Sequence, residues 1–214
     1  MAFVSWILHV IRNPDELIRL SGYPLLLLML IIFVETGALI FFLPGDSLLV
    51  TAGLYAARGS LDIVQLNVLL IPMAILGDAL SYYIGKKTGP ALFSRPRSRF
   101  FNPQHLRDAH AFYEKHGGKT IIIARFMPIF RTFVPVVAGA AEMGYARFAL
   151  YNVVGGASWV ASMTLTGYLL ASWAARHNFP IDKHIEKLIV IVVFLSILPA
   201  LIAYGRRHFG RQAG

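Results

Sequence analysis

An apolar stretch, IIIARFMPIFRTFVPVVAGAAEM at residues 121–143, carries two arginines, Arg125 and Arg131, close to two prolines, Pro128 and Pro135. A charged side chain in the hydrocarbon of a membrane costs about 2.5–3.5 kcal/mol on insertion scales. Proline removes a backbone donor and interrupts a helix. The stretch therefore predicts a broken membrane helix whose charges are paired or face a wet cavity.

A second apolar stretch, PLLLLMLIIFVETGALIFFLPGDSLLVTAGLYAA at residues 24–57, contains two carboxylates, Glu35 and Asp46, and a break at Pro44-Gly45. As one straight helix it would extend about 50 Å, whereas the hydrocarbon core is about 30 Å thick. It is too long for one span and too short for two spans with a turn. A helical hairpin that re-enters or barely crosses the membrane is predicted.

The composition is that of an integral membrane protein. Of 214 residues, 57% are hydrophobic and 14% are charged, and the mean hydropathy is +0.61, which is typical of membrane proteins. The net charge of +9 is interpreted as a topology signal, and no nucleic-acid partner is expected, because no soluble domain remains to present a basic patch. The absence of cysteine excludes disulfides, thiolate catalysis and cysteine-based metal sites.

The pattern predicts an all-α, polytopic membrane protein formed by a single domain. It comprises two inverted re-entrant (broken) helical hairpins, about three full transmembrane helices and an amphipathic N-terminal helix. The N-terminus lacks a basic region and a cleavage site, so a cleaved signal peptide is not expected. The predicted segments are an interfacial helix at 1–23, a broken hairpin at 24–57, a span at 63–85, a basic loop at 86–118, a second broken hairpin at 119–145, and spans at 148–175 and 188–205.

Basic residues predict the orientation. Residues 86–119 carry eight lysines and arginines against two acids, and residues 206–211 carry three more arginines. Such segments remain in the cytoplasm, which places the C-terminus there and makes the two hairpins open on opposite faces. The side of the N-terminus stays open. A weak internal repeat, in which Gly139 echoes Gly53 and Gly155 echoes Gly77, is typical of transporters that bind their substrate between repeats.

Arg125 and Arg131 are the first candidate site residues, because forked guanidinium donors match phosphate or carboxylate. Across Pro128 they could converge on one cavity. Glu35 and Asp46 are expected to neutralise the arginines or carry a proton; the alternative is an ion pair that only holds the hairpins together.

Asp78, inside the predicted span at 63–85, either joins this network or bonds to the neighbouring Ser81 and Tyr82. Asn152 is a candidate for lining a groove that faces lipid, whereas packing is the better interpretation of Trp159. The histidine spacing does not match HExxH, and neither a nucleophile elbow nor a Walker loop is present. No enzyme chemistry, metal or cofactor is therefore expected.

These residues lie in the motifs FVETG at 33–37, FLPGDSLL at 42–49, GDALSYYIG at 77–85 and ARFMPIFRTFVP at 124–135, followed by Asn152, Gly155 and Trp159. Together they resemble the DedA family, also called the SNARE-associated or VTT-domain family, over roughly residues 23–168.

The resemblance implies a bacterial inner-membrane protein with two facing re-entrant hairpins. Family members are implicated in moving lipid phosphates, notably undecaprenyl phosphate, and in maintaining the proton-motive force. The resemblance implies that four residues occupy positions regarded as essential in the family: Glu35, Asp46, Arg125 and Arg131.

The resulting hypothesis is a flippase for an anionic lipid phosphate, with membrane lipids and protons as its partners. A proton- or cation-coupled exporter of small solutes is the first alternative, and a non-transporting membrane organiser or assembly factor is the second. The small residues at 155–158 also allow the close helix packing of a homo-oligomer.

Overall fold

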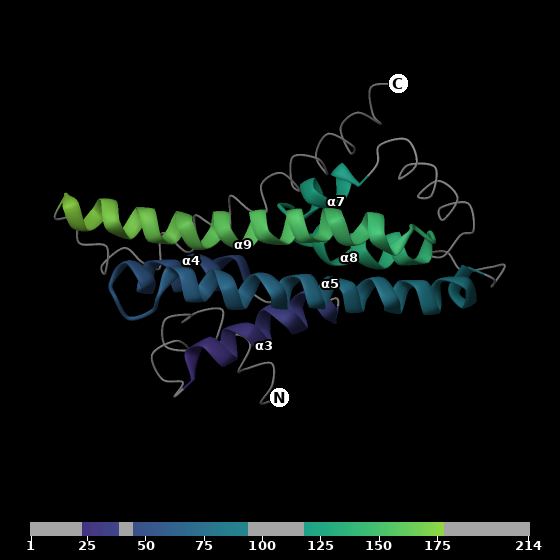
Figure 1. The fold of residues 1–214 in the computed structure, drawn as a ribbon, viewed down its shortest axis with the longest axis horizontal. Coiled ribbons are helices and arrows are strands. Elements are labelled where there is room, and N and C mark those ends of the chain that lie inside the picture. Colours follow the sequence, from purple (N-terminus) through teal and green to yellow (C-terminus); the bar gives the residue numbers. More distant parts are fainter. Residues whose placement is uncertain (1–22, 39–44, 94–117, 178–214) are drawn as a thin grey trace, which may run out of the picture.

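The computed structural model describes residues 23–38, 45–93 and 118–177, and every regular element in these ranges is a helix (Figure 1). Two segments, Ile63–Gly89 and Tyr145–Arg176, are long and apolar enough to cross a membrane. The predicted all-α class is confirmed for this part of the chain. The predicted helix at 1–23, most of the basic loop and the span at 188–205 lie outside the described residues. The elements are α3 (Pro24–Gly37), α4 (Gly45–Ala57), α5 (Ile63–Phe93), α7 (Lys119–Ala124), α8 (Pro128–Ala140) and α9 (Tyr145–Arg176).

The two long helices, α5 and α9, run antiparallel and contact each other (Figure 1). Helices α3 and α8 pack on α5, whereas α4 and α7 pack on α9. Exchanging α3 with α7, α4 with α8 and α5 with α9 therefore leaves the main helix contacts unchanged. The two long helices that correspond in this exchange, α5 and α9, run in opposite directions (Figure 1).

Close glycine contacts hold α4 against α9. A Cβ atom on Gly53 of α4 would lie 1.9 Å from the carbonyl oxygen of Thr164 in α9. Conversely, a Cβ atom on Gly167 of α9 would lie 1.9 Å from the carbonyl oxygen of Val50 in α4. Only glycine permits backbones to approach this closely, as at small-residue interfaces of membrane helices.

The crossing of α8 over α5 repeats this arrangement. A Cβ atom on Gly139 would lie 2.0 Å from the carbonyl oxygen of Tyr82, and one on Gly85 would lie 2.0 Å from that of Val136. Gly139 thus makes the same kind of contact as Gly53, in line with their sequence echo.

The second predicted echo is wrong in register. The crossings pair Gly85 of α5 with Gly167 of α9, which is one helical turn away from the register that would pair Gly77 with Gly155. A sequence comparison of single glycines in two long apolar helices cannot fix the register, since small residues recur on every turn.

The length of the predicted hairpin at 119–145 divides it into two halves, before and after Phe130-Arg131, but the break lies earlier in the structure. Helix α7 ends at Ala124, Met127 is extended with φ −120° and ψ 108°, and α8 begins at Pro128. Proline pushes the preceding residue out of the helical region, so the break precedes Pro128 instead of dividing the segment at Phe130-Arg131. Pro135 lies inside α8, which continues past it.

Helix α5 is longer than the span predicted at 63–85. It continues through Lys86 and Lys87 to Phe93. Lysine is a good helix former, so the change from apolar to basic residues marks a change of environment and does not end the helix.

The described part of the protein exposes large apolar side chains and buries several charged ones within a largely apolar core. Large apolar side chains are exposed along the outer faces, among them Leu26, Val64, Val68 and Leu150. The buried residues include five charged ones. Exposed leucine and valine are stable where the surroundings are lipid, and the buried charges require partners. The five buried charged residues are Glu35, Asp46, Asp78, Arg125 and Arg131.

Candidate functional site

The five buried charges form two centres. The Arg131 centre contains Glu35, Asp46, Arg131 and Trp159, and the Arg125 centre contains Asp78, Arg125 and Asn152. The predicted candidates are thus all partners in one centre or the other. The two arginines do not share one set of ligands, although Asp78 also interacts electrostatically with Arg131.

In the Arg131 centre, one guanidinium holds two carboxylates. Arg131 Nη1 donates to Asp46 Oδ1 at 2.6 Å, and Arg131 Nη2 donates to Glu35 Oε1. Glu35 comes from the last turn of α3, Asp46 from the first turn of α4, and Arg131 from the first turn of α8. Three broken helix ends are therefore joined by one arginine.

Trp159, for which packing is the better interpretation from sequence, also contacts the Arg131 centre. Its Nε1 donates to Asp46 Oδ1 at 2.9 Å, and Arg131 Cζ lies 4.3 Å from the centre of its ring. Trp159 is fully buried, and a buried indole N–H needs an acceptor. That requirement, in a span without charges of its own, is the signal that could have placed Trp159 beside a carboxylate from another segment.

Gly45 brings the start of α4 against Glu35. A Cβ atom at Gly45 would lie 1.8 Å from Glu35 Oε2. Any larger residue would displace the carboxylate from Arg131. The glycine of the Pro44-Gly45 break therefore shapes the Arg131 centre, in addition to any bend it permits.

Ser81 fixes the end of α3. Its Oγ donates to the carbonyl oxygens of Thr36 at 2.7 Å and Gly37 at 3.1 Å. The last carbonyls of a helix lack internal partners, so this hydroxyl from α5, whose single hydrogen the two carbonyls share, supports the end of α3 next to Glu35. Ser81 is not a partner of Asp78, and Tyr82 donates to the Met143 carbonyl instead.

In the Arg125 centre, Arg125 Nη2 donates to both Asp78 Oδ2 and Asn152 Oδ1. Asn152 Nδ2 in turn donates to the Ile75 carbonyl at 3.0 Å. Arg125 follows the last residue of α7, while Asp78 lies within α5 and Asn152 in α9. The alternative in which Asp78 joins the charge network is therefore the one found.

Two glycines of α9 lie next to the Arg125 side chain, at distances where a Cβ atom would make ordinary van der Waals contact. A Cβ atom at Gly156 would lie 3.5 Å from Arg125 Nη1 and Nη2, and one at Gly155 would lie 3.4 Å from Arg125 Cγ. The arginine thus lies along a surface without side chains. The same Gly156 Cβ would lie 3.1 Å from Ile75 Cγ1.

The two centres leave charges and donors uncompensated. Within the described ranges, three carboxyl groups face two guanidiniums, so one carboxyl group is in excess. Among the described residues, the atoms that lack a hydrogen-bond partner include Glu35 Oε2, Asp78 Oδ1 and Arg131 Nε, together with Nε and Nη1 of Arg125. Buried unsatisfied polar groups each cost about 1–3 kcal/mol, and more when charged. They are consequently predisposed to take up a proton, water or a ligand. No group of His, Asp and Glu suited to a metal ion occurs in the described ranges.

A VTT domain matches residues 43–169. The chain is 43% identical to the protein DedA of Escherichia coli K12 over 203 residues, which are 93% of this chain and 90% of that protein. The chain belongs to the DedA family. It is also 46% identical over 188 residues to an uncharacterised membrane protein of Mycobacterium leprae, covering 86% of this chain and 82% of that one. The inner membrane protein YqjA of Escherichia coli K12 is 29% identical over 207 residues, covering 95% and 92%. No solved structure matches.

Membership of the DedA family confirms that this is a membrane protein. The VTT domain begins two residues before Gly45 and thus includes Asp46, Asp78, both buried arginines and Trp159. Glu35 lies before it, but within the part of the chain aligned with DedA-family relatives over more than nine-tenths of its length. Both centres are therefore features of the region that the chain has in common with this family.

Proposed function

We propose that this DedA-family protein moves an anionic lipid phosphate, with undecaprenyl phosphate as the leading candidate, across the bacterial inner membrane. The observation that supports this most directly is the buried Arg125 guanidinium, whose Nε and Nη1 have no partner among the described residues. Guanidinium donors match phosphate oxygens in pairs. A phosphate at Arg125 would use these donors and compete with the bonds to Asp78 and Asn152.

The helix lengths support a transporter arrangement. Helices α3, α4 and α8 have 14, 13 and 13 residues, or about 20 Å each, which is less than the hydrocarbon thickness. In this proposal α3–α4 and α7–α8 are re-entrant pairs that enter from opposite faces, α5 and α9 cross the bilayer, and the C-terminus is cytoplasmic. The reciprocal glycine crossings are consistent with two inverted halves.

The acidic residues occupy the arginine donors that this proposal assigns to the substrate phosphate. When no phosphate is bound, Glu35 and Asp46 neutralise Arg131 and Asp78 neutralises Arg125. A phosphate that takes an arginine releases a carboxylate, and a released carboxylate in a dry site takes up a proton. Because the network already holds one excess carboxylate, coupling to protons is part of the proposal.

The excess carboxylate also favours a second candidate function, a proton- or cation-coupled exporter of small solutes. Glu35 Oε2 is buried and unpaired among the described residues, so it offers a place for a proton even without a phosphate. In that mechanism the acids bind the transported ion and the arginines are their counter-charges.

The test is movement of a labelled polyprenyl phosphate across the membrane of proteoliposomes, with and without an imposed pH gradient. Arg125→Gln and Arg131→Gln are compared with Arg58→Gln, a matched change at an exposed arginine outside both centres. We expect movement by the wild-type protein and Arg58→Gln, and loss to the level of empty liposomes in the other two. Folded wild-type protein that moves no lipid phosphate, yet dissipates a pH gradient through Glu35, would support the exporter. Absence of both activities would support an organiser, and release of inorganic phosphate would reveal an enzyme.

A further inference from the structure

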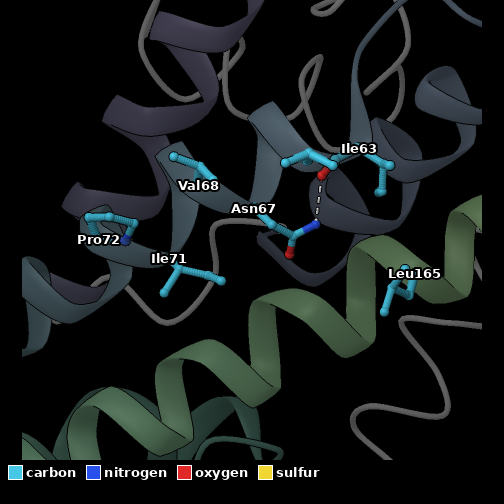
Figure 2. A pocket seen from close by; sticks show the side chains of 7 residues that line it. Ile63, Asn67, Val68, Ile71, Pro72 and Leu165 are labelled. Carbon is cyan, nitrogen blue, oxygen red and sulfur yellow. Dashed lines mark hydrogen bonds between the residues drawn. The ribbon is translucent and has the colours of Figure 1, made fainter.

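An open apolar groove runs between the two long helices α5 and α9 (Figure 2). Its volume is about 550 Å³, within the range of sites that hold small organic ligands. It lies between the N-terminal part of α5 and the C-terminal part of α9, away from both charged centres. The lining residues are Ile63, Val64, Asn67, Val68, Ile71, Pro72 and Leu165.

The one polar side chain among the lining residues, Asn67, is hydrogen-bonded to both long helices. Asn67 Nδ2 donates to the Ile63 carbonyl at 2.8 Å, as Figure 2 shows, and Asn67 Oδ1 accepts from Thr164 Oγ1 at 3.2 Å. An occupant therefore meets a largely apolar wall, whose single polar side chain is tied by hydrogen bonds to the two helices. This chemistry fits a hydrocarbon chain.

The groove follows the helical face of Asp78. Val64, Asn67 and Ile71 lie 14, 11 and 7 residues before Asp78, which places all four within about 40° of one face of α5. Val64 is 65% exposed, Asn67 and Ile71 are partly buried, and Asp78 is 1% exposed. This face therefore passes from the lipid-facing surface into the Arg125 centre, over about 10 Å of helix between Ile71 and Asp78.

The inner end of the groove lies close to the Arg125 centre, and Ile75 is the side chain between them. Ile75, one turn beyond Ile71, lies against Gly156, and Gly156 also lies against the Arg125 guanidinium. A head group at Arg125 is thus one side chain away from the inner end of the groove.

From this continuity we propose that the groove holds the hydrocarbon tail of a lipid whose phosphate binds at Arg125. This inference rests on the proposed function and deepens it, because it assigns head and tail of one substrate to two ends of the same face of α5. The helices on both sides of the groove, α5 and α9, are the two with the length and composition of membrane spans. Its open side therefore faces acyl chains, from which a long tail enters without leaving hydrocarbon.

The test separates tail binding from head-group binding. Affinities of purified protein for a short isoprenyl phosphate and a long polyprenyl phosphate are measured for Val68→Trp, which fills the groove. Leu76→Trp is the matched control, since Leu76 is 51% exposed, compared with 62% for Val68, and points away from the Asp78 face of the same helix. Each buried methylene contributes substantially to binding, so Val68→Trp is expected to weaken the long phosphate about tenfold or more. The short phosphate and Leu76→Trp are expected to match wild type.

The possible results of this experiment distinguish failure of the tail site from failure of the proposed function. Equal affinities of Val68→Trp and Leu76→Trp for the long phosphate would overturn the tail site, even with phosphate binding intact. If the wild type binds neither phosphate, the proposed function itself fails. A photoreactive residue at position 68 in native membranes identifies the occupant: an adduct with lipid supports the proposal, whereas cross-linking to a second copy or to residues 178–214 overturns it.

Discussion

Trp159→Phe removes the indole N–H that binds Asp46 and keeps an aromatic ring beneath Arg131. In the wild-type protein the Nε1 to Oδ1 distance is 2.9 Å and the guanidinium carbon lies 4.3 Å from the ring centre. If Trp159 is part of the Arg131 centre and not merely packing, this substitution weakens the centre far more than the small loss of volume implies.

The expected loss follows from the two interactions. A hydrogen bond to a charged group contributes about 1.5–3 kcal/mol. Phenylalanine retains a weaker cation–π interaction, so roughly 0.5–1 kcal/mol is lost there. Trp159→Phe should therefore lower the free energy of unfolding by about 2–4 kcal/mol. Trp173→Phe, the same change at a side chain that is 55% exposed on the same helix, should change it by no more than about 0.5 kcal/mol.

A double-mutant cycle with Asp46→Ala isolates the contact, with unfolding by SDS in mixed micelles followed by circular dichroism. If the indole acts through Asp46, Trp159→Phe costs less in the Asp46→Ala background, with a coupling of about 1–2 kcal/mol. Equal costs in both backgrounds, within about 0.3 kcal/mol, would refute the assignment and return Trp159 to packing.

Three further predictions concern the helix contacts and the charges. Gly53→Ala should lower the folded yield in detergent strongly, because its Cβ would lie 1.9 Å from a carbonyl oxygen, whereas Gly144→Ala, with no atom within 4 Å, should match wild type by size-exclusion chromatography. Ser81→Ala should cost about 1–3 kcal/mol of stability in SDS unfolding, because two carbonyls at the end of α3 lose the one hydroxyl hydrogen that they share; an unchanged midpoint would contradict this role of Ser81. Arg131→Gln should cost about 3–5 kcal/mol by leaving two carboxylates unpaired, and Glu35→Gln should recover part of that loss when combined with it; a double variant less stable than Arg131→Gln would rule out this pairing.

Local chemistry in the sequence determines much of the fold, but not its register. The break before Pro128 and the helix start at Gly45 follow from backbone rules. The hairpin tip at 39–44 lies outside the described residues. The register of α5 against α9 depends on which carbonyl each glycine meets, and that is a tertiary property.

The site residues could be predicted, whereas their partners could not. Buried charges in apolar segments are conspicuous, and Glu35, Asp78 and Arg125 were all identified on that ground. Which acid binds which arginine depends on how α3, α5, α7 and α8 pack, since every pairing satisfies the same charge rule. Trp159 was missed because an indole in an apolar helix looks the same whether its N–H meets lipid headgroups or a buried carboxylate.

The directions of α3 and α8 bear on the exchange of partners that the proposed function requires at the Arg131 centre. The partial charge at a helix N-terminus is positive and that at a C-terminus is negative. Arg131 lies in the first turn of α8 and Glu35 in the last turn of α3, so each sits where the helix dipole opposes its charge. Their mutual contact compensates both, with Asp46 as a further partner of Arg131. An arginine at the start of a helix gains from any anion that replaces a departing carboxylate, and a carboxylate at the end of a helix gains from a proton. Both biases favour the exchange that a phosphate carrier requires.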